Sequence, residues 1–258
     1  MHWPVIAFEE IDSTNKEAQR RLSSGAVDGT WITAARQTAG RGRSGRSWQS
    51  LDGNLFASLV LPLDCEPNVL HHLSLVSGVA LRNAVSSCCE GQVTQIDVRL
   101  KWPNDVLINE AKVAGILVES SIIGTRVVAI IGIGVNLQTA PELSDRKTAR
   151  LAAFGISHTP AEFLEALDKA FFDAISRWDN GTGFDLIRHA WLNHSFSVGQ
   201  PISINATDGR VHGAFAGLDE DGALLIRASD GKISVFHFGD VAIGGEAATD
   251  ANGDTKIT

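Results

Sequence analysis

Cysteine is scarce in this sequence, and its placement argues against a disulfide-stapled fold. The chain has three cysteines, Cys65 and the adjacent Cys88 and Cys89, which form neither a C-x-x-C motif nor an even set. This usage is typical of reduced, buried thiols in a cytosolic protein. We therefore expect structural cysteines and a cytoplasmic location.

Long hydrophobic runs and a targeting segment are missing as well. No apolar run approaches the roughly 20 residues that a membrane helix needs. The N-terminal stretch MHWPVIAFEEID turns acidic at Glu9 and has neither a basic region nor a cleavage site, unlike a signal peptide. The 258 residues are enough for one large domain, or for one domain and a second, small one. We expect no contact with a membrane.

Positive charge is in the minority overall but concentrated in one loop. The formal net charge is −8, yet Thr38–Trp48 reads TAGRGRSGRSW. Between Asp28 and Asp52 the only charged residues are four arginines: Arg36, Arg41, Arg43 and Arg46. A general nucleic-acid binder would carry a basic face over much of its surface. A local patch favours a small anion such as a phosphate, and we expect no DNA binding.

Two well-known phosphate motifs match the loop by letter but not by context. Gly40-x-Gly42-x-x-Gly45 fits the dinucleotide-binding fingerprint, and Gly40-x4-Gly45-Arg46-Ser47 approximates a P-loop. Both motifs require a helix directly afterwards, because the helix N-terminus holds the phosphate. Here WQSLDGNLFASLVLP follows, which predicts a turn and a strand.

The loop is better explained without a helix. Glycines let a backbone approach a ligand, and arginine forks suit phosphate and carboxylate oxygens. Such a loop could order over a nucleotide and its leaving pyrophosphate, excluding water. The alternative, a solvated loop with scattered salt bridges, stays open at this point.

The spacing of apolar residues predicts a mixture of strands and helices. The expected strands are Trp3–Glu9, Thr30–Arg36, Asn54–Leu61 (ended by Pro62), Ile96–Trp102, Val106–Ile108, Val113–Ser121 and Arg126–Val135. The expected helices run from Asp12–Asn15 to Leu22, from Val69 to Cys89 before Gly91, from Pro160 to about Trp178, and from Phe184 to His194. Capping boxes are expected at Thr14 with Glu17 and at Thr159 with Glu162, and a hairpin turn at 109–111.

The pattern of the sequence changes after Ser195. Four short β-like runs, separated by Asp-Gly turns, predict a small barrel: Pro201–Asn205, Val211–Leu218, Leu224–Ala228 and Ile233–His237. The end of the chain is polar and weakly patterned. We therefore expect domains at 1–195 and 196–246, followed by a disordered tail at 247–258.

Five motifs in register resemble those of biotin–protein ligases. They are DSTN (12–15), QTAGRGRSGRSW (37–48), KWPNDVLI (101–108), KVAGILVE (112–119) and GIGVNL (132–137). The segment LDEDGALLIRASDG (218–231) is similar to that family's small terminal domain. Together they extend the resemblance over nearly the whole chain.

The resemblance implies an α+β fold and a two-step reaction. The fold would be a mixed β-sheet with flanking helices, like the catalytic core of class II aminoacyl-tRNA synthetases, followed by an SH3-like barrel. Biotin and Mg-ATP would give biotinyl-5′-AMP and pyrophosphate, and a lysine of a carboxylase's biotin carboxyl carrier domain would then take the biotin. Some relatives carry an N-terminal winged helix-turn-helix domain that binds operator DNA. Because DSTN begins at Asp12, we expect no such domain and no repressor role here.

The resemblance also implies the residues of the site. Those expected in the chemistry are Lys112, Arg43, Asp105 and Lys101. Those expected to bind biotin are Ser13, Thr14, Asn15, Gln37, Arg41, Gly42, Arg43, Lys112, Gly115, Gly132 and Gly134. Those expected to bind ATP or the adenylate are Arg43, Arg46, Trp48, Asp105 and Asn136. The Mg²⁺ ligands, and the choice between monomer and homodimer, stay open.

Several of these residues have plainer explanations. Lys112 could be a charge at an exposed strand end, Trp48 a core residue, and Thr14 only a helix cap. Asp105 could cap a turn, hold Mg²⁺ or position Lys101, and the sequence does not choose among these roles. The glycines of GIGVNL could mark strand bulges rather than a ligand slot.

Two other functions compete with biotin ligation. A lipoate or octanoate ligase would share the fold and the adenylate chemistry, but the arginine-rich loop and the C-terminal barrel favour biotin. A protein that holds biotin or biotinyl-AMP without transferring it is also conceivable. The presence of Lys112, Asp105 and the full loop argues against that reading.

Overall fold

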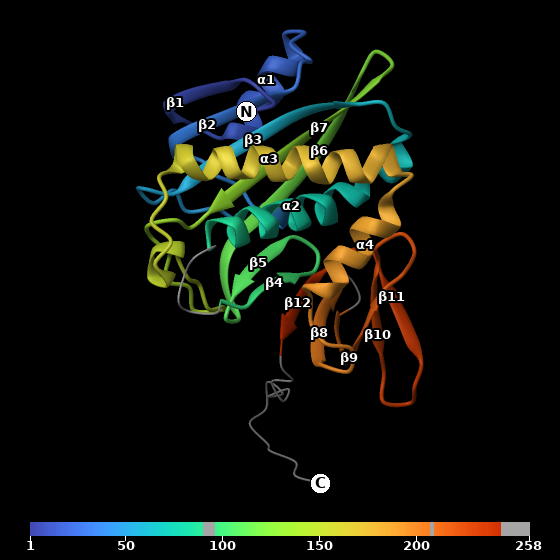
Figure 1. The fold of residues 1–258 in the computed structure, drawn as a ribbon. Helices are drawn as coiled ribbons and strands as arrows, with labels where there is room; N and C mark the ends of the chain where they lie inside the picture. The colour runs from blue at the N-terminus through green and yellow to red at the C-terminus, as the bar shows by residue number, and fades with distance from the viewer. Residues whose placement is uncertain (90–95, 207–208, 244–258) are drawn as a thin grey trace. The chain divides into compact units, whose positions relative to one another are not determined.

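A seven-stranded mixed sheet organises the N-terminal part of the chain (Figure 1). The structure, a computed structural model, describes residues 1–89, 96–206 and 209–243. Within these residues the strand order is β1-β2-β3-β7-β6-β5-β4. The strands are β1 (Val5–Ile11), β2 (Thr30–Gln37), β3 (Leu55–Leu63), β4 (Val98–Lys101), β5 (Asp105–Ile108), β6 (Ala111–Ile123) and β7 (Arg126–Val135).

Helices lie on both faces of this sheet. Neighbouring residues of a strand point to opposite faces, so Trp31 and Ile32 of β2 report on the two sides. Ile32 packs in a cluster with Ala18 and Leu22 of α1 (Thr14–Ser23). The Trp31 ring instead meets Phe171 of α3 (Pro160–Trp178) edge-on, at 5.6 Å between ring centroids. The sheet is therefore sandwiched between α1 on one face and the layer of α2 (Leu73–Cys88) and α3 on the other (Figure 1).

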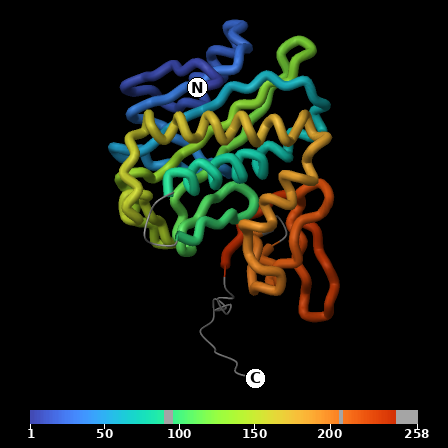
Figure 2. Tube along the Cα trace, in the orientation of Figure 1, coloured from blue at the N-terminus to red at the C-terminus, as the bar shows by residue number. Residues whose placement is uncertain are grey.

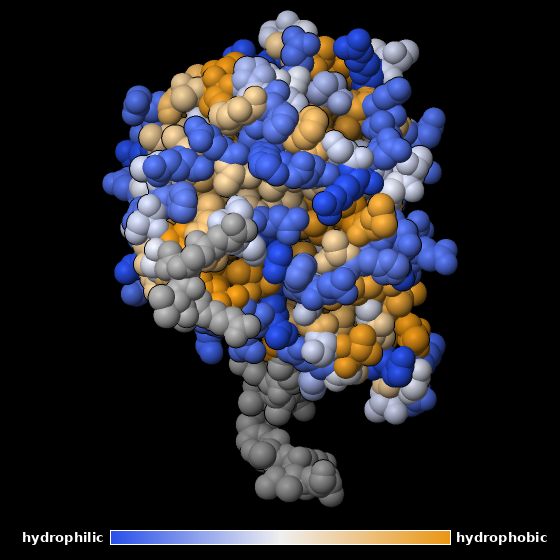
Figure 3. All heavy atoms as spheres, viewed as in Figure 1, coloured by the Kyte–Doolittle hydropathy of each residue, from blue (hydrophilic) through white to orange (hydrophobic). Residues whose placement is uncertain are grey.

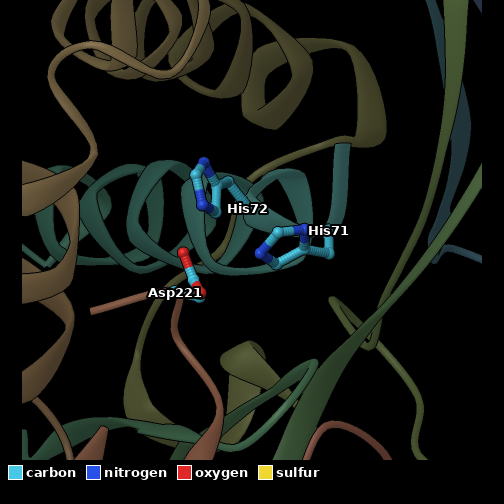
Figure 4. A group of neighbouring side chains, drawn as sticks. All are labelled: His71, His72 and Asp221. Atoms are coloured by element: carbon cyan, nitrogen blue, oxygen red, sulfur yellow. The ribbon is translucent and has the colours of Figure 1, made fainter. Parts of the chain in front are cut away.

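The layer of α2, α3 and α4 (Phe184–Asn193) is joined through aromatic packing. His72 lies at the N-terminal end of α2 (Figure 4). It stacks on Phe184 at 3.5 Å between ring centroids and accepts a hydrogen bond from Trp178 Nε1. The outer surface of this layer mixes hydrophilic side chains with smaller hydrophobic areas, as its amphipathic helices require (Figure 3).

The N-terminus is fastened to α3 (Figure 2). The Asp168 carboxylate accepts from the backbone N–H groups of His2 and Trp3, from His2 Nδ1 and from Trp31 Nε1. Asp168 is fully buried, and burial alone would raise its pKa. The hydrogen bonds from His2 and Trp31 outweigh that effect and hold the pKa of Asp168 below its ordinary value.

Most predicted elements of this part are confirmed within a few residues. The Thr159–Glu162 capping box starts α3, and the hairpin turn between β5 and β6 places Asn109 and Glu110 at positive φ. The basic loop is followed by a strand, as expected, and not by an α-helix. The predicted helix stop at Gly91 lies outside the described residues.

Three local predictions are wrong. The N-cap of α1 is Ser13, whose side chain makes no capping hydrogen bond. The predicted Thr14–Glu17 capping box does not form, because the backbone N–H and the hydroxyl of Thr14 both donate to Gln37. Pro62 does not end β3. At Pro62, β3 still pairs with β7 but no longer with β2, so no hydrogen bond from a proline N–H is needed on the β2 side. The helix predicted from Val69 begins as a 3₁₀ segment, Pro67–His72, because apolar spacing alone does not separate 3₁₀ from α geometry.

The C-terminal part forms an antiparallel five-stranded sheet of order β11-β10-β9-β8-β12. Its strands are β8 (Pro201–Ala206), β9 (Gly209–Leu218), β10 (Leu224–Arg227), β11 (Ile233–Phe236) and β12 (Asp240–Ile243). The first four were predicted, and β12 was missed. By backbone contacts the chain divides into Met1–Ser195 and Phe196–Thr258. The predicted tail at 247–258 and the turn residue Asp208 lie outside the described residues.

The expectation of buried structural cysteines is confirmed for Cys88, while Cys65 and Cys89 are partly exposed. All three cysteines are free; Cys88 is buried, and burial raises the pKa of its thiol. A thiol of that kind is unreactive, as expected for a structural residue. In the described residues, none of the helices combines the length and the apolar content required to cross a bilayer.

Candidate functional site

On the α1 face of the sheet, the central strand β7 has no side chain at Gly132 and Gly134, and neighbouring β6 has none at Gly115; we call this glycine-lined strip the trough. Gly132 pairs with Ser58 of β3 and Leu117 of β6, while Gly134 pairs with Phe56 and Gly115. These positions are not bulges, because the register of β7 with both neighbours is unbroken there. The glycines therefore lower the floor of the sheet along one line.

Two side chains lie directly on that floor. A Cβ at Gly132 would stand 2.2 Å from Asn15 Oδ1, and a Cβ at Gly134 would stand 2.3 Å from Cε2 of Trp48. At Gly115 a Cβ would be 2.9 Å from the Trp48 ring and 3.0 Å from Lys112 Nζ. The predicted residues of four separate motifs thus meet in the trough, and a side chain at any of these glycines would displace Asn15, Trp48 or Lys112.

The polar end of the trough is built from the start of α1. The amide oxygen of Gln37 accepts from Thr14 N at 2.9 Å and from Thr14 Oγ1 at 3.2 Å. The hydroxyl of Ser58 lies 2.7 Å from Thr14 Oγ1 and 2.6 Å from Asn15 Oδ1. Ser13, Thr14 and Asn15 are buried, so this end presents fixed polar groups in a dry setting. Ser58 was missed, although a serine inside the apolar run LFASLVLPL is a signal.

The basic loop is held by hydrogen bonds within itself and by contacts of its arginines with residues next to the trough. Arg41 and Ser47 form an isolated antiparallel bridge, and Gly42 N donates to Arg46 O at 2.7 Å. Arg41 NH2 lies 3.3 Å from Glu119 Oε1. Arg43 NH1 donates to Asn104 Oδ1 at 3.0 Å, and Asn104 Nδ2 in turn donates to the backbone oxygen of Ile116. Arg41 therefore contacts the KVAGILVE segment, and Arg43 contacts the KWPND segment.

A cluster of charges stands next to the trough. Lys112 Nζ lies 2.5 Å from Asp105 Oδ1, and Lys101 Nζ lies 3.5 Å from Oδ2. Burial would raise the pKa of Asp105, but the charges of Lys112 and Lys101 hold it below its ordinary value. Burial lowers the pKa of Lys101, and the charge of Asp105 offsets this only in part. The side chain of Lys112 is 16% exposed, so the interpretation as an exposed strand-end charge is wrong.

Arg146 is a cation of this cluster that the sequence did not reveal. Lys112 N donates to Lys147 O, and Ala149 N donates to Lys112 O, both at 2.9 Å, so this segment runs beside Lys112. The charge of Arg146 contributes to lowering the pKa of both Asp105 and Lys101. Arg146 also binds Asp145, and that bond lowers the pKa of Asp145, with a contribution from Arg46. A polar stretch such as SDRKT carries no local signal for this placement.

Asn136 and Trp48 differ in how their polar atoms are satisfied. Asn136 is buried, and its Nδ2 donates to Ala149 O at 3.1 Å, so it anchors the segment that carries Arg146. The Trp48 indole N–H is buried without a hydrogen-bond partner among the described residues. Lys112 Nζ lies 5.4 Å from the centroid of that ring, within range of a cation–π interaction.

The residues of the cluster do not fit a protein-held Mg²⁺. Mg²⁺ requires carboxylate or other oxygen ligands in octahedral geometry. Both oxygens of Asp105 face lysine ammonium groups, and a divalent cation there would be repelled by them.

The arrangement has close relatives among known proteins. Residues 7–136 match the model of the biotin/lipoate A/B protein ligase family, and residues 198–244 match the biotin protein ligase C terminal domain. The chain belongs to the biotin protein ligase family. Its relatives include the biotin–[acetyl-CoA-carboxylase] ligase of Paracoccus denitrificans, at 38% identity over 91% of this chain and 98% of that protein. The bifunctional ligase/repressor BirA of Bacillus subtilis is 31% identical over 93% of this chain and 74% of its own length.

Solved biotin protein ligases have the same fold. The Aquifex aeolicus ligase in complex with biotin and ATP superimposes with a TM-score of 0.77 at 30% identity, covering 93% of this chain and 99% of that one. The Leishmania major ligase in complex with biotinyl-5-AMP gives a TM-score of 0.65 at 27% identity, covering 90% and 98%. The mixed sheet with its helices and the C-terminal antiparallel sheet are thus those of the ligase family.

Proposed function

We propose that this protein is a biotin–protein ligase that forms biotinyl-5′-AMP from biotin and ATP and transfers the biotin to a lysine of a biotin carboxyl carrier domain. The observation that carries the proposal is the glycine-floored trough, with fixed polar groups at one end and the Lys101–Asp105–Lys112 cluster beside it. We assign the chemistry to residues 1–195, which would be built like a class II aminoacyl-tRNA synthetase core, and an SH3-like barrel to 196–246.

Biotin fits the trough by its chemistry. Its ureido head offers two donors and one acceptor on an otherwise apolar molecule, so it needs a dry slot with a few fixed polar groups. Ser13, Thr14, Asn15 and Gln37 supply such groups next to Gly132. The valeryl carboxylate would then point toward Lys112, beyond Gly115.

The cations next to the trough suit adenylate formation. A carboxylate must attack the α-phosphate, and two anions repel each other unless cations offset their charge. Lys112, Arg43 and Arg46 would do so for the reacting atoms, and Lys101 and Arg146 would add to the field. Asp105 holds the two lysines in place. In this proposal it orients the lysines, and Mg²⁺ would arrive bound to the ATP phosphates.

Trp48 would form the boundary between the two ligands. Its ring already lies on Gly134 and Gly115, and an aromatic face can stack on adenine. Asn136 would keep the segment of Arg146 against Lys112. In the second half-reaction the acceptor lysine, with an ordinary pKa of about 10.4, must be neutral to attack. Proximity to the mixed anhydride would supply most of that step.

The experiment that tests the function is ATP–pyrophosphate exchange, with biotin, lipoate and octanoate offered in parallel to the purified protein. Exchange with biotin alone, followed by labelling of a carrier domain, is the expected result. Exchange with lipoate or octanoate instead would keep the adenylate chemistry and overturn the substrate. Tight biotin binding without exchange would indicate a binding protein. The match of residues 198–244 to the ligase C-terminal domain favours biotin.

The cellular setting follows from the same proposal. Three free cysteines and a carrier-domain substrate fit a cytoplasmic enzyme.

The choice between monomer and homodimer is a separate point. Size-exclusion chromatography with light scattering would distinguish the two states.

A further inference from the structure

Glu119, on β6, contacts two parts of the site with one carboxylate. Its Oε2 accepts a hydrogen bond from Asn15 Nδ2 at 2.7 Å, while its Oε1 lies 3.3 Å from Arg41 NH2. Asn15 belongs to the polar end of the trough, and Arg41 is the first arginine of the basic loop. The function proposed above gives Glu119 no role.

At its buried end, Glu119 fixes the orientation of an amide. Asn15 Oδ1 lies 2.6 Å from the Ser58 hydroxyl and only 2.2 Å from where a Cβ of Gly132 would be. With its oxygen directed there, the amide must send its N–H groups the other way, toward Glu119 and the backbone oxygen of Leu117. Asn15 is 3% exposed, so water does not replace these partners. The carboxylate therefore keeps the Asn15 oxygen turned toward the floor of the trough.

At its outer end, Glu119 anchors the loop. Among the contacts described above, two attach the loop to the β6 side: Arg41 binds Glu119, and Arg43 binds Asn104, which in turn binds the backbone of Ile116. The two attachment points on β6, Ile116 and Glu119, therefore lie on either side of residues 117–118, and Ile116 directly follows Gly115 of the trough. Without Glu119, the described contacts would leave the Arg41 end of the loop without an ion pair to the sheet.

We propose that Glu119 is a positioning residue of the ligase reaction, which holds the basic loop over the trough through Arg41 and orients Asn15 for the ligand below. This inference rests on the proposed function. The Arg41 and Glu119 side chains are 39% and 26% exposed, and ion pairs of that exposure contribute little to global stability. The effect of losing the pair should therefore appear in ligand retention and leave the fold unchanged.

The deciding variant is Glu119→Gln. The glutamine oxygen can still accept from Asn15, but the side chain no longer carries a charge for Arg41. We expect biotinyl-AMP to be released about three- to ten-fold faster, while the biotin KM stays near that of the unaltered protein, because only the partly exposed ion pair is lost. Glu119→Ala removes both contacts and should raise the biotin KM as well. Release is measured by rapid filtration of the complex formed with radiolabelled biotin.

A double-mutant cycle with Arg41→Ala separates this role from a general effect of charge. Glu119→Gln should accelerate release much less in the Arg41→Ala background than alone. The matched control is Glu10→Gln, which breaks a similar pair with Arg36 (3.1 Å) at the β1–β2 edge and should leave release unchanged. Fully multiplicative effects of the two changes, or unchanged release in Glu119→Gln, would overturn the inference while the proposed function stands. Absence of biotin-dependent exchange in the unaltered protein would overturn both.

Discussion

The indole of Trp48 lies directly against the backbone of Gly134, with ring atom Cε2 only 2.3 Å from where a Cβ would be. The ring and the strand fit together because the strand position has no side chain. Gly115, on the neighbouring strand, meets the same ring at 2.9 Å. The two glycines and the tryptophan come from three different sequence motifs, so the trough exists only in the folded chain.

Gly134→Ala should therefore damage biotin binding more than it damages the fold. A methyl group must displace the Trp48 ring, and overpacking of this kind costs about 1–3 kcal/mol in unfolding free energy. We expect the biotin KM in the exchange assay to rise at least about ten-fold, which corresponds to roughly 1.4 kcal/mol of binding. Urea unfolding measures the stability term separately.

Two further variants make this test specific. Gly78→Ala, on α2, places its methyl no closer than 3.5 Å to any neighbour, so it should leave the biotin KM unchanged and raise the unfolding free energy by up to about 1 kcal/mol, since alanine is favoured over glycine in a helix. In a Trp48→Ala background the ring that the methyl would displace is absent, so Gly134→Ala should then have a smaller effect on the biotin KM. If the effect on KM were undiminished there, the methyl group would obstruct biotin directly and would not act by displacing the Trp48 ring.

Lys112→Ala should abolish most adenylate formation and should weaken biotin binding by a much smaller factor, because Lys112 also faces the biotin carboxylate in this proposal. Lys112 is the nearest cation to Asp105 and borders the trough at Gly115, where charge is expected to build up on the reacting oxygens. Loss of such a preorganised group typically lowers the rate about 10²- to 10³-fold. Exchange rate and biotin affinity by calorimetry would be measured on the same preparation.

The control for Lys112→Ala is Lys147→Ala. Lys147 is exposed, and the contact it makes to Lys112 runs through its backbone oxygen, which alanine retains. An exchange rate that falls equally in both variants would contradict a specific role for the Lys112 ammonium group.

Local patterns in the sequence predicted the fold better than they predicted the site's connections. The α3 capping box and the β5–β6 turn depend on residues a few positions apart, and both are confirmed. The Thr14–Glu17 box has equally good spacing but fails, because a tertiary partner, Gln37, takes the Thr14 side chain. A pattern confined to one segment cannot weigh such a competitor.

The missed residues have a common physical reason. Ser58 and Glu119 gain their roles by contacting Asn15 of α1, which is 43 and 104 positions away in the sequence, respectively. Arg146 gains its role by lying near Asp105 and Lys101, about 40 positions away. The resemblance to ligases predicted the trough residues because they belong to five motifs that occur in register. It assigned nothing to residues that act through other residues.

Arg146 and its neighbour Asp145 should have opposite effects on ATP binding. Arg146→Ala removes a cation next to Lys101 and Asp105, so we expect the KM for ATP to rise by about ten-fold, in the range of a charged hydrogen bond. Asp145→Asn removes the carboxylate that binds Arg146 and lies near Arg46, so the KM for ATP should fall or stay level. Both changes should shrink as salt is raised, since the charges are partly exposed. A rise in KM for both variants would indicate that the segment acts through its conformation.

Asp168 offers a test of pH-dependent stability away from the trough. Its pKa is held below the ordinary value of about 3.9 by donors from His2, Trp3 and Trp31. A depressed pKa in the folded state stabilises the protein above the ordinary pKa, and this stabilisation is lost as the pH falls through the folded-state value. Unfolding free energies between pH 7 and pH 3 should therefore fall on acidification, and Asp168→Asn should show a shallower fall from a starting point about 1–3 kcal/mol lower. The control is Asp173→Asn on the same helix, whose exposed pair with Lys169 contributes at most about 0.5 kcal/mol. If Asp168→Asn kept the full slope of the unaltered protein, the acid sensitivity would have to come from other carboxylates, such as Asp105 beside Lys112.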